Sequence, residues 1–252
     1  VIVGGGATGV EMAGALREIA ARTIPQDFRR VDTSTARVIL LEGRDTLLPG
    51  MSARAGARAQ AQLEDMGVEV RTGSMVTGMD DLAVILGDER VPAENVIWAA
   101  GVQGSPLAGS LGVELDRQGR VKVKEDCSVP GYPNAFVVGD LASLNDPETG
   151  RPVPGVAQGA LQMGRFVGGV IRDALATGGP SSVRRPFHYM DKGTMGTGGR
   201  ARAVADVGEL TFDGFFAWLL WSTVHVLYLI GFRNKLLVMV NCACQWLVHA
   251  RR

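Results

Sequence analysis

The sequence predicts an α/β protein that ends in apolar helices. Over residues 1–102, apolar segments of strand length alternate with helical segments, and a glycine-rich turn joins the first two. Residues 212–252 are much more apolar than the rest of the chain. The 252 residues suffice for one large or two ordinary domains, and the 26 basic and 26 acidic residues balance, so net charge does not indicate nucleic acid as a partner.

The first region follows the strand–helix order of nucleotide-binding folds. VIVGG predicts a short buried strand and residues 8–22 a helix. ARVILLEG predicts a second buried strand, residues 51–66 a second helix, and VEVRTG a third strand. Short antiparallel strands are expected over residues 75–86, before NVIWAAG returns as a core strand. This order predicts a Rossmann-like domain with a β-ribbon insert.

The turn after the first strand carries a dinucleotide-binding motif. GGGATG fits the pattern GxGxxG, in which Gly4 permits a tight turn, Gly6 lets a pyrophosphate approach the backbone and Gly9 lets the helix pack on the sheet. Ala7 and Thr8 begin the helix, where free N–H groups would face the phosphates.

An acidic residue at the end of the second strand complements this motif. The Glu42 carboxylate would accept hydrogen bonds from a ribose 2′-OH and repel a 2′-phosphate, which favours NADH over NADPH. Glu42 lies further from the motif than the usual roughly 20 residues because the polar insert TIPQDFRRVDTSTA intervenes. The alternative is a structural glycine turn beside a surface glutamate.

Glu11 is an unusual residue for its position in the first helical turn after the motif. The helix dipole would stabilise its charge there. We expect it to face a redox centre, and simple compensation of the dipole is the alternative.

A second region begins near Gly104. It contains a polar strand, a turn rich in Pro and Gly, and a strand expected to be buried up to Gly139-Asp140. Residues 155–177 predict a long helix, and residues 186–210 are rich in glycine with short strands.

The apolar tail predicts two amphipathic helices at a membrane surface. FFAWLLWSTVHVLYLIG and LLVMVNCACQWLVH are each shorter than the roughly 20 residues that a spanning helix needs. Their tryptophans suit the interfacial zone, and Arg233, Lys235, Arg251 and Arg252 would meet anionic head groups. A buried helical hairpin or a homodimer interface is the alternative.

The cysteines do not indicate a metal site. Cys127, Cys242 and Cys244 form no CxxC pair and have no metal-ligand spacing, so we expect reduced, structural thiols.

The motifs taken together resemble the type II NADH:quinone oxidoreductases, single-subunit NADH dehydrogenases that do not pump protons. The resemblance rests, in the family's order, on GGGATGVEMAG, VILLEGRDTLLP, VIWAAGV, VVGDLA, VAQGALQMG, YMDKGTMGTGGRARAV and LIGFRNKL. It implies an FAD domain interrupted by an NADH domain and followed by a membrane-binding part.

On this basis we expect an NADH-binding domain over residues 1–103 and the second half of an FAD-binding domain over residues 104–185. Residues 186–252 would form the membrane-binding and quinone-site region. The first half of the FAD domain is missing from this sequence, so the chain resembles a C-terminal fragment.

The resemblance also assigns cofactor contacts. Ala100 and Gly101 would contact the NADH. Gly139 and Asp140 would hold the ribityl and phosphate region of FAD, although an aspartate at this position also suits a helix cap.

Four residues would tune the contact between flavin and quinone: Glu11, Gln158, Gln162 and Lys192. Ala157 and Gln158 belong to an AQxxxQ stretch, and Gln158 and Gln162 share one helix face, from which their amides would donate to a quinone carbonyl. The Lys192 cation would stabilise negative charge on the flavin. A polar helix face and a surface lysine are the alternatives. Gly198 stands where we would expect a bulkier apolar residue.

The functional hypothesis is a peripheral enzyme on the cytoplasmic face of the cell membrane, which passes a hydride from NADH to FAD and then two electrons to a membrane quinone. One alternative is another flavin-dependent NAD(P)H or sulfide:quinone oxidoreductase, but sulfide chemistry needs redox cysteines near the flavin and Cys127 stands alone. The other is a flavin-free NADH-binding remnant.

Overall fold

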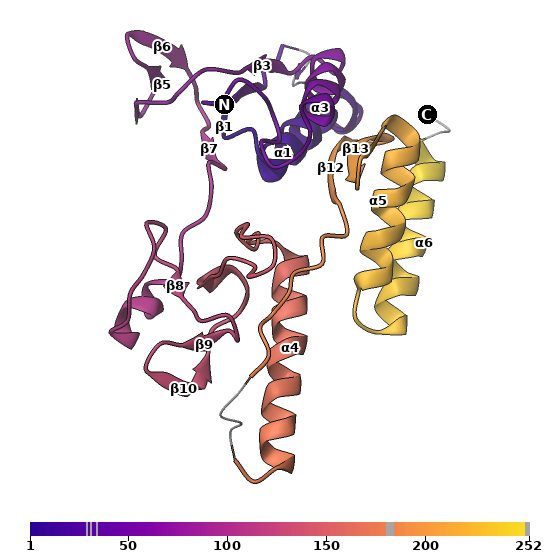
Figure 1. The fold of residues 1–252 in the computed structure, drawn as a ribbon. Helices are drawn as coiled ribbons and strands as arrows, with labels where there is room; N and C mark the ends of the chain where they lie inside the picture. The colour runs from indigo at the N-terminus through magenta and orange to yellow at the C-terminus, as the bar shows by residue number, and fades with distance from the viewer. Residues whose placement is uncertain (29, 31, 34, 180–183, 250–252) are drawn as a thin grey trace. The chain divides into compact units, whose positions relative to one another are not determined.

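The computed structural model describes residues 1–28, 30, 32–33, 35–179 and 184–249 (Figure 1). They form two compact units, one made of Val1–Gly101 with the segment from Gly193 onward, the other of Val102–Lys192. The α/β class predicted from the sequence is confirmed. The three functional parts expected from the sequence differ from these units and stay a prediction.

A four-stranded parallel sheet forms the core of the first unit. Its order is β3–β2–β1–β7, with β1 (Ile2–Val3), β2 (Ile39–Leu41), β3 (Glu69–Arg71) and β7 (Ile97–Trp98). β1 pairs in parallel with both β2 and β7, so the strand order reverses beside β1. Crevices at such reversals, outside the carboxyl ends of the strands, are where open α/β sheets bind ligands.

Two helices pack on this sheet. α1 (Ala7–Glu18) continues through a π-helical turn, η1 (Ile19–Thr23), into α2 (Ile24–Asp27), so the helical segment extends beyond the predicted residues 8–22. α3 (Ala53–Asp65) begins after Ser52, whose hydroxyl accepts the N–H of Ala55 at 3.2 Å. This cap explains why α3 starts two residues later than predicted.

The β-ribbon insert has one strand more than the sequence indicated. β4 (Gly78–Asp80), β5 (Ala83–Leu86) and β6 (Glu89–Pro92) form an antiparallel sheet. The prediction stopped at Leu86 and missed β6, because a strand whose residues are mostly exposed gives a weak alternation of apolar and polar residues.

The rest of the first unit is an antiparallel sheet followed by two helices. β12 (Thr194–Gly199), β13 (Arg202–Val207) and β14 (Leu210–Asp213) lead into α5 (Gly214–Tyr228) and α6 (Phe232–His249). Within the described part of the chain, no helix is both long and apolar enough to cross a bilayer. Arg251 and Arg252, expected at head groups, lie outside the described residues.

The second unit is built around the long helix α4 (Ala157–Ala176). Its other elements are short: η2 (Pro106–Leu111), β8 (Val121–Lys122), β9 (Ser128–Val129), β10 (Tyr132–Phe136), η3 (Gly139–Leu141) and β11 (Ala142–Ser143). Cys127, Met163 and Phe187 belong to its core. The strand before Gly139 was expected to be buried, but β10 is largely exposed, and among the described residues it pairs with β9 in a two-stranded sheet.

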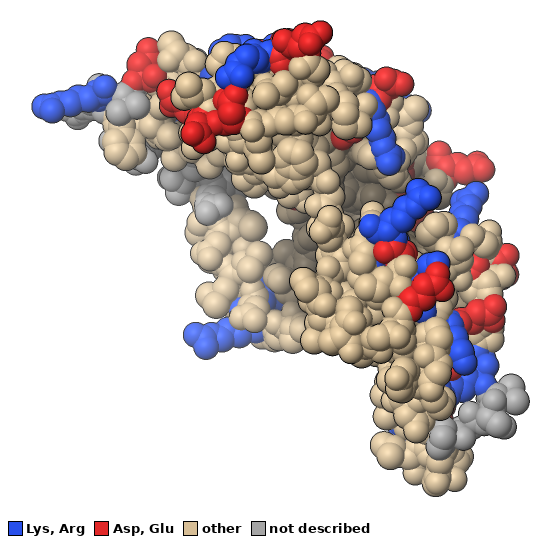
Figure 2. Space-filling model, turned by 90° about the vertical axis from the view of Figure 1, so that its left-hand side faces the viewer, with Lys and Arg blue, Asp and Glu red and all other residues tan. Residues whose placement is uncertain are grey.

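Charged side chains of both signs are interspersed on the face shown in Figure 2. Ion pairs near the surface of the first unit include Arg71 with Glu89 at 2.8 Å and Arg90 with Asp80 at 2.7 Å. Ion pairs this exposed contribute little to the stability of a fold, because water and salt screen the charges.

α1 and β12 approach each other unusually closely. A Cβ at Gly14 of α1 would overlap the carbonyl oxygen of Gly198, whereas a Cβ at Gly198 would meet only Leu63 Cδ2 at 3.6 Å. The glycine at position 198, unexpected in the sequence, therefore lies where its backbone contacts the helix.

We predict that Gly14→Ala lowers the free energy of unfolding by about 2–4 kcal/mol, because the new methyl group must push the helix off the strand. Gly198→Ala, on the other side of the same contact, should cost clearly less. Chemical denaturation of both variants measures this, and equal losses would contradict the close approach.

One buried carboxylate organises the second unit. Asp146 is 4% exposed, its Oδ1 accepts the N–H groups of Glu148 and Thr149, and its Oδ2 accepts that of Tyr189 at 2.7 Å. These backbone donors, first that of Tyr189, lower the pKa of Asp146. The carboxylate thus ties a surface turn to the segment that leads to Lys192.

A lowered folded-state pKa means that Asp146 stabilises the fold above its unfolded pKa of about 4, and that this contribution is lost as the pH falls through the folded value. We predict that Asp146→Asn costs about 1–3 kcal/mol near pH 7 and flattens the loss of stability between about pH 5 and pH 3. Unfolding curves at several pH values test this. An unchanged pH slope would rule out the role of this carboxylate.

Candidate dinucleotide-binding site

The glycine loop is folded tightly between β1, β7 and α1. Gly4 has a φ of +109°, and a Cβ there would lie 2.6 Å from the carbonyl oxygen of Ala99 and 2.7 Å from the nitrogen of Ala100. A Cβ at Gly9 would overlap the carbonyl oxygen of Gly4. Both positions therefore require glycine, as the motif predicts.

Glu42 holds this loop from the end of β2. Its Oε2 accepts the N–H of Gly5 at 2.6 Å, and its Oε1 accepts the N–H of Arg44 at 2.8 Å. The side chain is half-buried. Each carboxylate oxygen has a further lone pair, so the group can also accept a hydroxyl donor from a ligand.

The space in front of α1 is open. A Cβ at Gly6, the N-cap residue, would meet no atom within 4 Å, and no side chain caps the helix. Ala7 and Thr8 are exposed in the first turn. The helix start therefore offers N–H groups to an anion such as a pyrophosphate.

The end of β7 borders the same loop. Ala100 is exposed and its backbone lies against Gly4, while Gly101 is exposed with a φ of +99°. The structure thus brings the predicted residues of the glycine motif together with Glu42 and Ala100 at the reversal of strand order.

Glu11 lies one turn further along α1, near β12 and α5. Burial raises the pKa of its carboxyl above the usual value. In opposition to burial, a backbone hydrogen bond from Thr197 in β12 and the electrostatic effect of His225 in α5 both lower the pKa of this carboxyl. Its expected position at a redox centre stays a prediction.

In the second unit, the turn at Gly139 and Asp140 lies against the start of α4. Gly139 has a φ of +69°, and a Cβ there would come 3.1 Å from the Cβ of Ala160. Asp140 is exposed. The N-cap residue Val156 supplies no side-chain acceptor, so the first N–H groups of α4, including that of Ala157, are available to a ligand.

The two glutamines of α4 bind the backbone that precedes β12. Gln162 Nε2 donates to the carbonyl of Met190 at 2.9 Å, and Gln162 Oε1 accepts the N–H of the same residue at 2.9 Å. Gln158 Oε1 accepts the N–H of Lys192 at 3.3 Å. Both amides are expected from the sequence to donate to a quinone, and their hydrogen bonds to this backbone segment are a feature that the sequence does not indicate. An amide has two N–H groups, so Gln162 can still donate the second.

The sequence analysis also missed Asp146, which positions the same segment through Tyr189. The turn-forming run NDPETG was the available signal, since an Asp before Pro with a following Gly is typical of a side chain that accepts backbone N–H groups.

The cysteines and the other potential ligands do not form a second centre. Burial, together with the charge of Asp126, raises the pKa of Cys127 to about 12. Cys242 and Cys244 are exposed on α6. In the described ranges, no three His, Cys, Asp or Glu side chains gather in a way that could hold a metal ion.

Residues 1–164 match the family model described as pyridine nucleotide-disulphide oxidoreductase. The chain is 45% identical over 249 residues to the type II NADH:quinone oxidoreductase Ndh of Mycobacterium tuberculosis, covering 95% of this chain and 52% of the relative. It is 43% identical over 261 residues to NdhA of the same organism, covering 100% of this chain and 54% of the relative. The chain therefore spans about half the length of these curated relatives.

A solved structure shares the fold. The structure of NDH2 from Plasmodium falciparum in complex with NADH superimposes with a TM-score of 0.82 at 16% identity, covering 93% of this chain and 63% of that chain. The family model covers well over half of the sequence and includes the glycine loop, Glu42 and the turn at Asp140. The chain accordingly belongs to the pyridine nucleotide-disulphide oxidoreductase family.

Proposed function

We propose that this chain acts in an NADH:quinone oxidoreductase. The observation that carries the proposal is the carboxylate of Glu42, fixed on the N–H of Gly5 beside the open start of α1. The two mycobacterial relatives are both named as type II NADH:quinone oxidoreductases, which supports a quinone as the electron acceptor in this proposal. Because the chain spans about half of their length, the activity, cofactors and partners belong to the proposal.

In this proposal the first unit binds NADH. The N–H groups of the first turn of α1 bind the pyrophosphate, and the absence of a side chain at Gly6 leaves room for it. Glu42 accepts the ribose hydroxyls, and its charge excludes a 2′-phosphate. Ala100 and Gly101 border the bound nucleotide from β7.

The second unit would contribute half of the FAD site. The exposed carboxylate of Asp140 suits the hydroxyl groups of a ribityl chain, and the uncapped start of α4 suits polar atoms of the ring. FAD, when bound, accepts a hydride and passes on electrons, which none of the side chains here does by itself.

We further propose that the remaining N–H of Gln162 and the Lys192 cation act at the quinone side, with Gln158 holding the backbone of Lys192 in place. Burial raises the pKa of the Glu11 carboxyl in the first unit, and its role in tuning the contact between flavin and quinone stays a prediction.

The membrane surface is the proposed location, on the cytoplasmic face, with a membrane quinone as the oxidant. Large apolar side chains are exposed along α5, α6 and the turn between them, including Phe216 at 76%, Ile230 at 89% and Phe232 at 81%. Arg233 and Lys235 follow directly, where cations would meet lipid head groups. A homodimer that covers the same helices is the other partner this surface fits.

No observation favours the sulfide-oxidising alternative. A thiol whose pKa is about 12 stays protonated at neutral pH and is a poor nucleophile, so Cys127 does not suit that chemistry. The flavin-free alternative is tested by adding FAD to the purified chain and separating the mixture by gel filtration. Yellow flavin absorbance that elutes with the protein would contradict this alternative.

We predict that Glu42→Gln weakens NADH binding by roughly tenfold and weakens NADPH binding less, because the charged acceptor for the ribose is lost together with the repulsion of a 2′-phosphate. Nucleotide titrations followed by fluorescence measure both constants. Glu64→Gln, which removes a charge from the exposed face of α3, is the control. Equal losses for the two nucleotides would argue against the assigned role of Glu42.

We predict that Gln162→Ala raises the KM for quinone several-fold and leaves NADH affinity unchanged. The substitution removes the amide proposed to donate to the quinone, together with the hydrogen bond that holds the backbone of Met190, and it changes nothing at the glycine loop. Steady-state kinetics of the FAD-supplemented protein test this. Gln60→Ala, which removes a glutamine of α3 whose side chain donates to Glu64, should change neither value. Unaltered quinone kinetics in Gln162→Ala would remove this residue from the site.

A further inference from the structure

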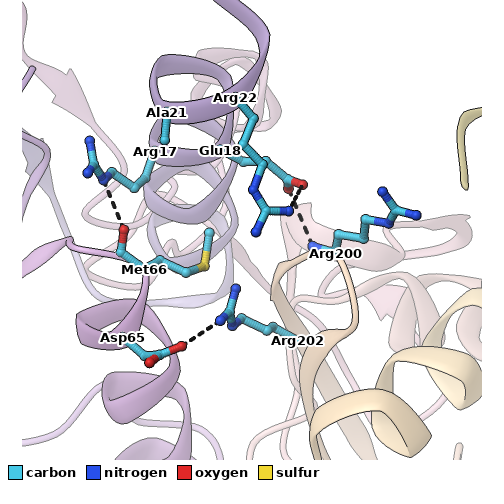
Figure 3. A pocket seen from close by; sticks show the side chains of 8 residues that line it. All are labelled: Arg17, Glu18, Ala21, Arg22, Asp65, Met66, Arg200 and Arg202. Atoms are coloured by element: carbon cyan, nitrogen blue, oxygen red, sulfur yellow. Dashed lines mark hydrogen bonds and ion pairs between the residues drawn. The ribbon is translucent and has the colours of Figure 1, made fainter. Parts of the chain in front are cut away.

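A second polar pocket lies in the first unit, at the other end of α1 from the glycine loop (Figure 3). It encloses about 160 Å³, and its lining comes from α1 with its π-turn, from the end of α3 and from the turn between β12 and β13. The lining residues are Arg17, Glu18, Ala21, Arg22, Asp65, Met66, Arg200 and Arg202. Four guanidinium groups thus accompany two carboxylates, which gives the lining a net positive charge.

Two of the arginines face each other across the pocket. Figure 3 shows the guanidinium groups of Arg22 and Arg202 reaching its middle from opposite walls, whereas those of Arg17 and Arg200 lie toward the edges. Arg22 is 3.7 Å from Glu18 Oε1, too long for a hydrogen bond, and Arg202 binds Asp65 Oδ2 through Nη2. Each guanidinium has five N–H donors, so both can serve a ligand between them.

The other polar groups fix the walls. Arg17 Nε donates to the carbonyl of Met66 at 2.9 Å, and Gly67 leaves room for this guanidinium because a Cβ there would lie 3.1 Å from Nε. The backbone N–H of Arg200 donates to Glu18 Oε2 at 3.4 Å. These contacts connect all three segments around the pocket without filling its middle.

Both arginines lie in or directly beside irregular backbone. Arg22 belongs to the π-turn η1, and such turns occur often at functional sites. Ala201, between Arg200 and Arg202, has a φ of +58°, a conformation that costs an alanine free energy. Two unrelated local irregularities therefore present the two arginines to the same space.

We propose that this pocket binds a phosphate group. Facing cations repel each other, and an anion between them relieves that repulsion. A tetrahedral phosphate directs oxygens at both walls, whereas a planar carboxylate offers one edge, so two opposed guanidinium groups suit phosphate better. The volume is below the roughly 300–1,000 Å³ of small-molecule pockets, which fits a free phosphate or a lipid phosphate head group and excludes a whole dinucleotide.

The first test is calorimetric titration of the protein with inorganic phosphate. Arg22→Gln and Arg202→Gln should each weaken binding about tenfold or more, since each removes a charged donor. Arg172→Gln, which removes an exposed arginine from α4, should leave it unchanged. Phosphate that binds at the glycine loop contributes equally to all four proteins, so the differences between them report this pocket.

A further variant separates binding from a structural role. Asp65→Asn removes the carboxylate that competes for Arg202, so phosphate should bind more tightly, whereas mere loss of a structural contact would not increase affinity. Arg22→Gln is the variant least expected to misfold, because the ion pair that it removes is exposed and weak, so its loss of phosphate binding is not explained by unfolding.

The second test identifies the source of the phosphate. Vesicles of phosphatidylcholine with phosphatidic acid should bind Arg202→Gln less well than Arg172→Gln if the ligand is a lipid head group, and equally well if it is soluble phosphate that the first test detects. Equal phosphate affinity in all variants, together with equal vesicle binding, would overturn the proposal. This outcome would leave the NADH proposal intact, because no residue of the glycine loop is changed.

Discussion

The contact between Glu42 and the glycine loop is the interaction on which the first unit depends. The carboxylate at the end of β2 accepts the N–H of Gly5, and the loop in turn lies against the backbone of Ala100 at the end of β7. Neighbouring strands of the parallel sheet are therefore connected at their carboxyl ends, around the space that would receive a pyrophosphate. A side chain at Gly4 or Gly9 would force this arrangement apart.

α1 links this loop to the rest of the unit. Its start offers N–H groups beside Gly6, its middle packs through Gly14 on the backbone of β12, and its end continues through a π-turn to the arginine pocket. Glu11, on the same helix, contacts β12 and is influenced by His225 in α5. One helix thus connects the proposed nucleotide site with the exposed apolar helices, and displacement of α1 would disturb both.

The sequence predicted the α/β class, the tight glycine loop and the place of Glu42 at the end of a strand, because those features follow from local patterns: apolar runs, glycines with a steric purpose and an acidic residue after a strand. The role of Glu42 toward a nucleotide stays a prediction. The predictions were wrong or incomplete where a feature depends on contacts between segments that lie far apart in the chain. The close approach at Gly198, the engagement of Gln162 with Met190 and the buried Asp146 all depend on contacts between residues far apart in the chain. The exposure of β10 likewise depends on what packs against the strand, which its own composition does not report.

The most direct test of the account is the half-reaction between NADH and bound flavin. Protein loaded with FAD is mixed with NADH in the absence of oxygen, and the flavin absorbance is followed before and after a soluble quinone is added. The account predicts that NADH bleaches the flavin, that NADPH does so far more slowly, and that quinone restores the colour. Retained flavin that NADH does not bleach, or that quinone does not reoxidise, would contradict it.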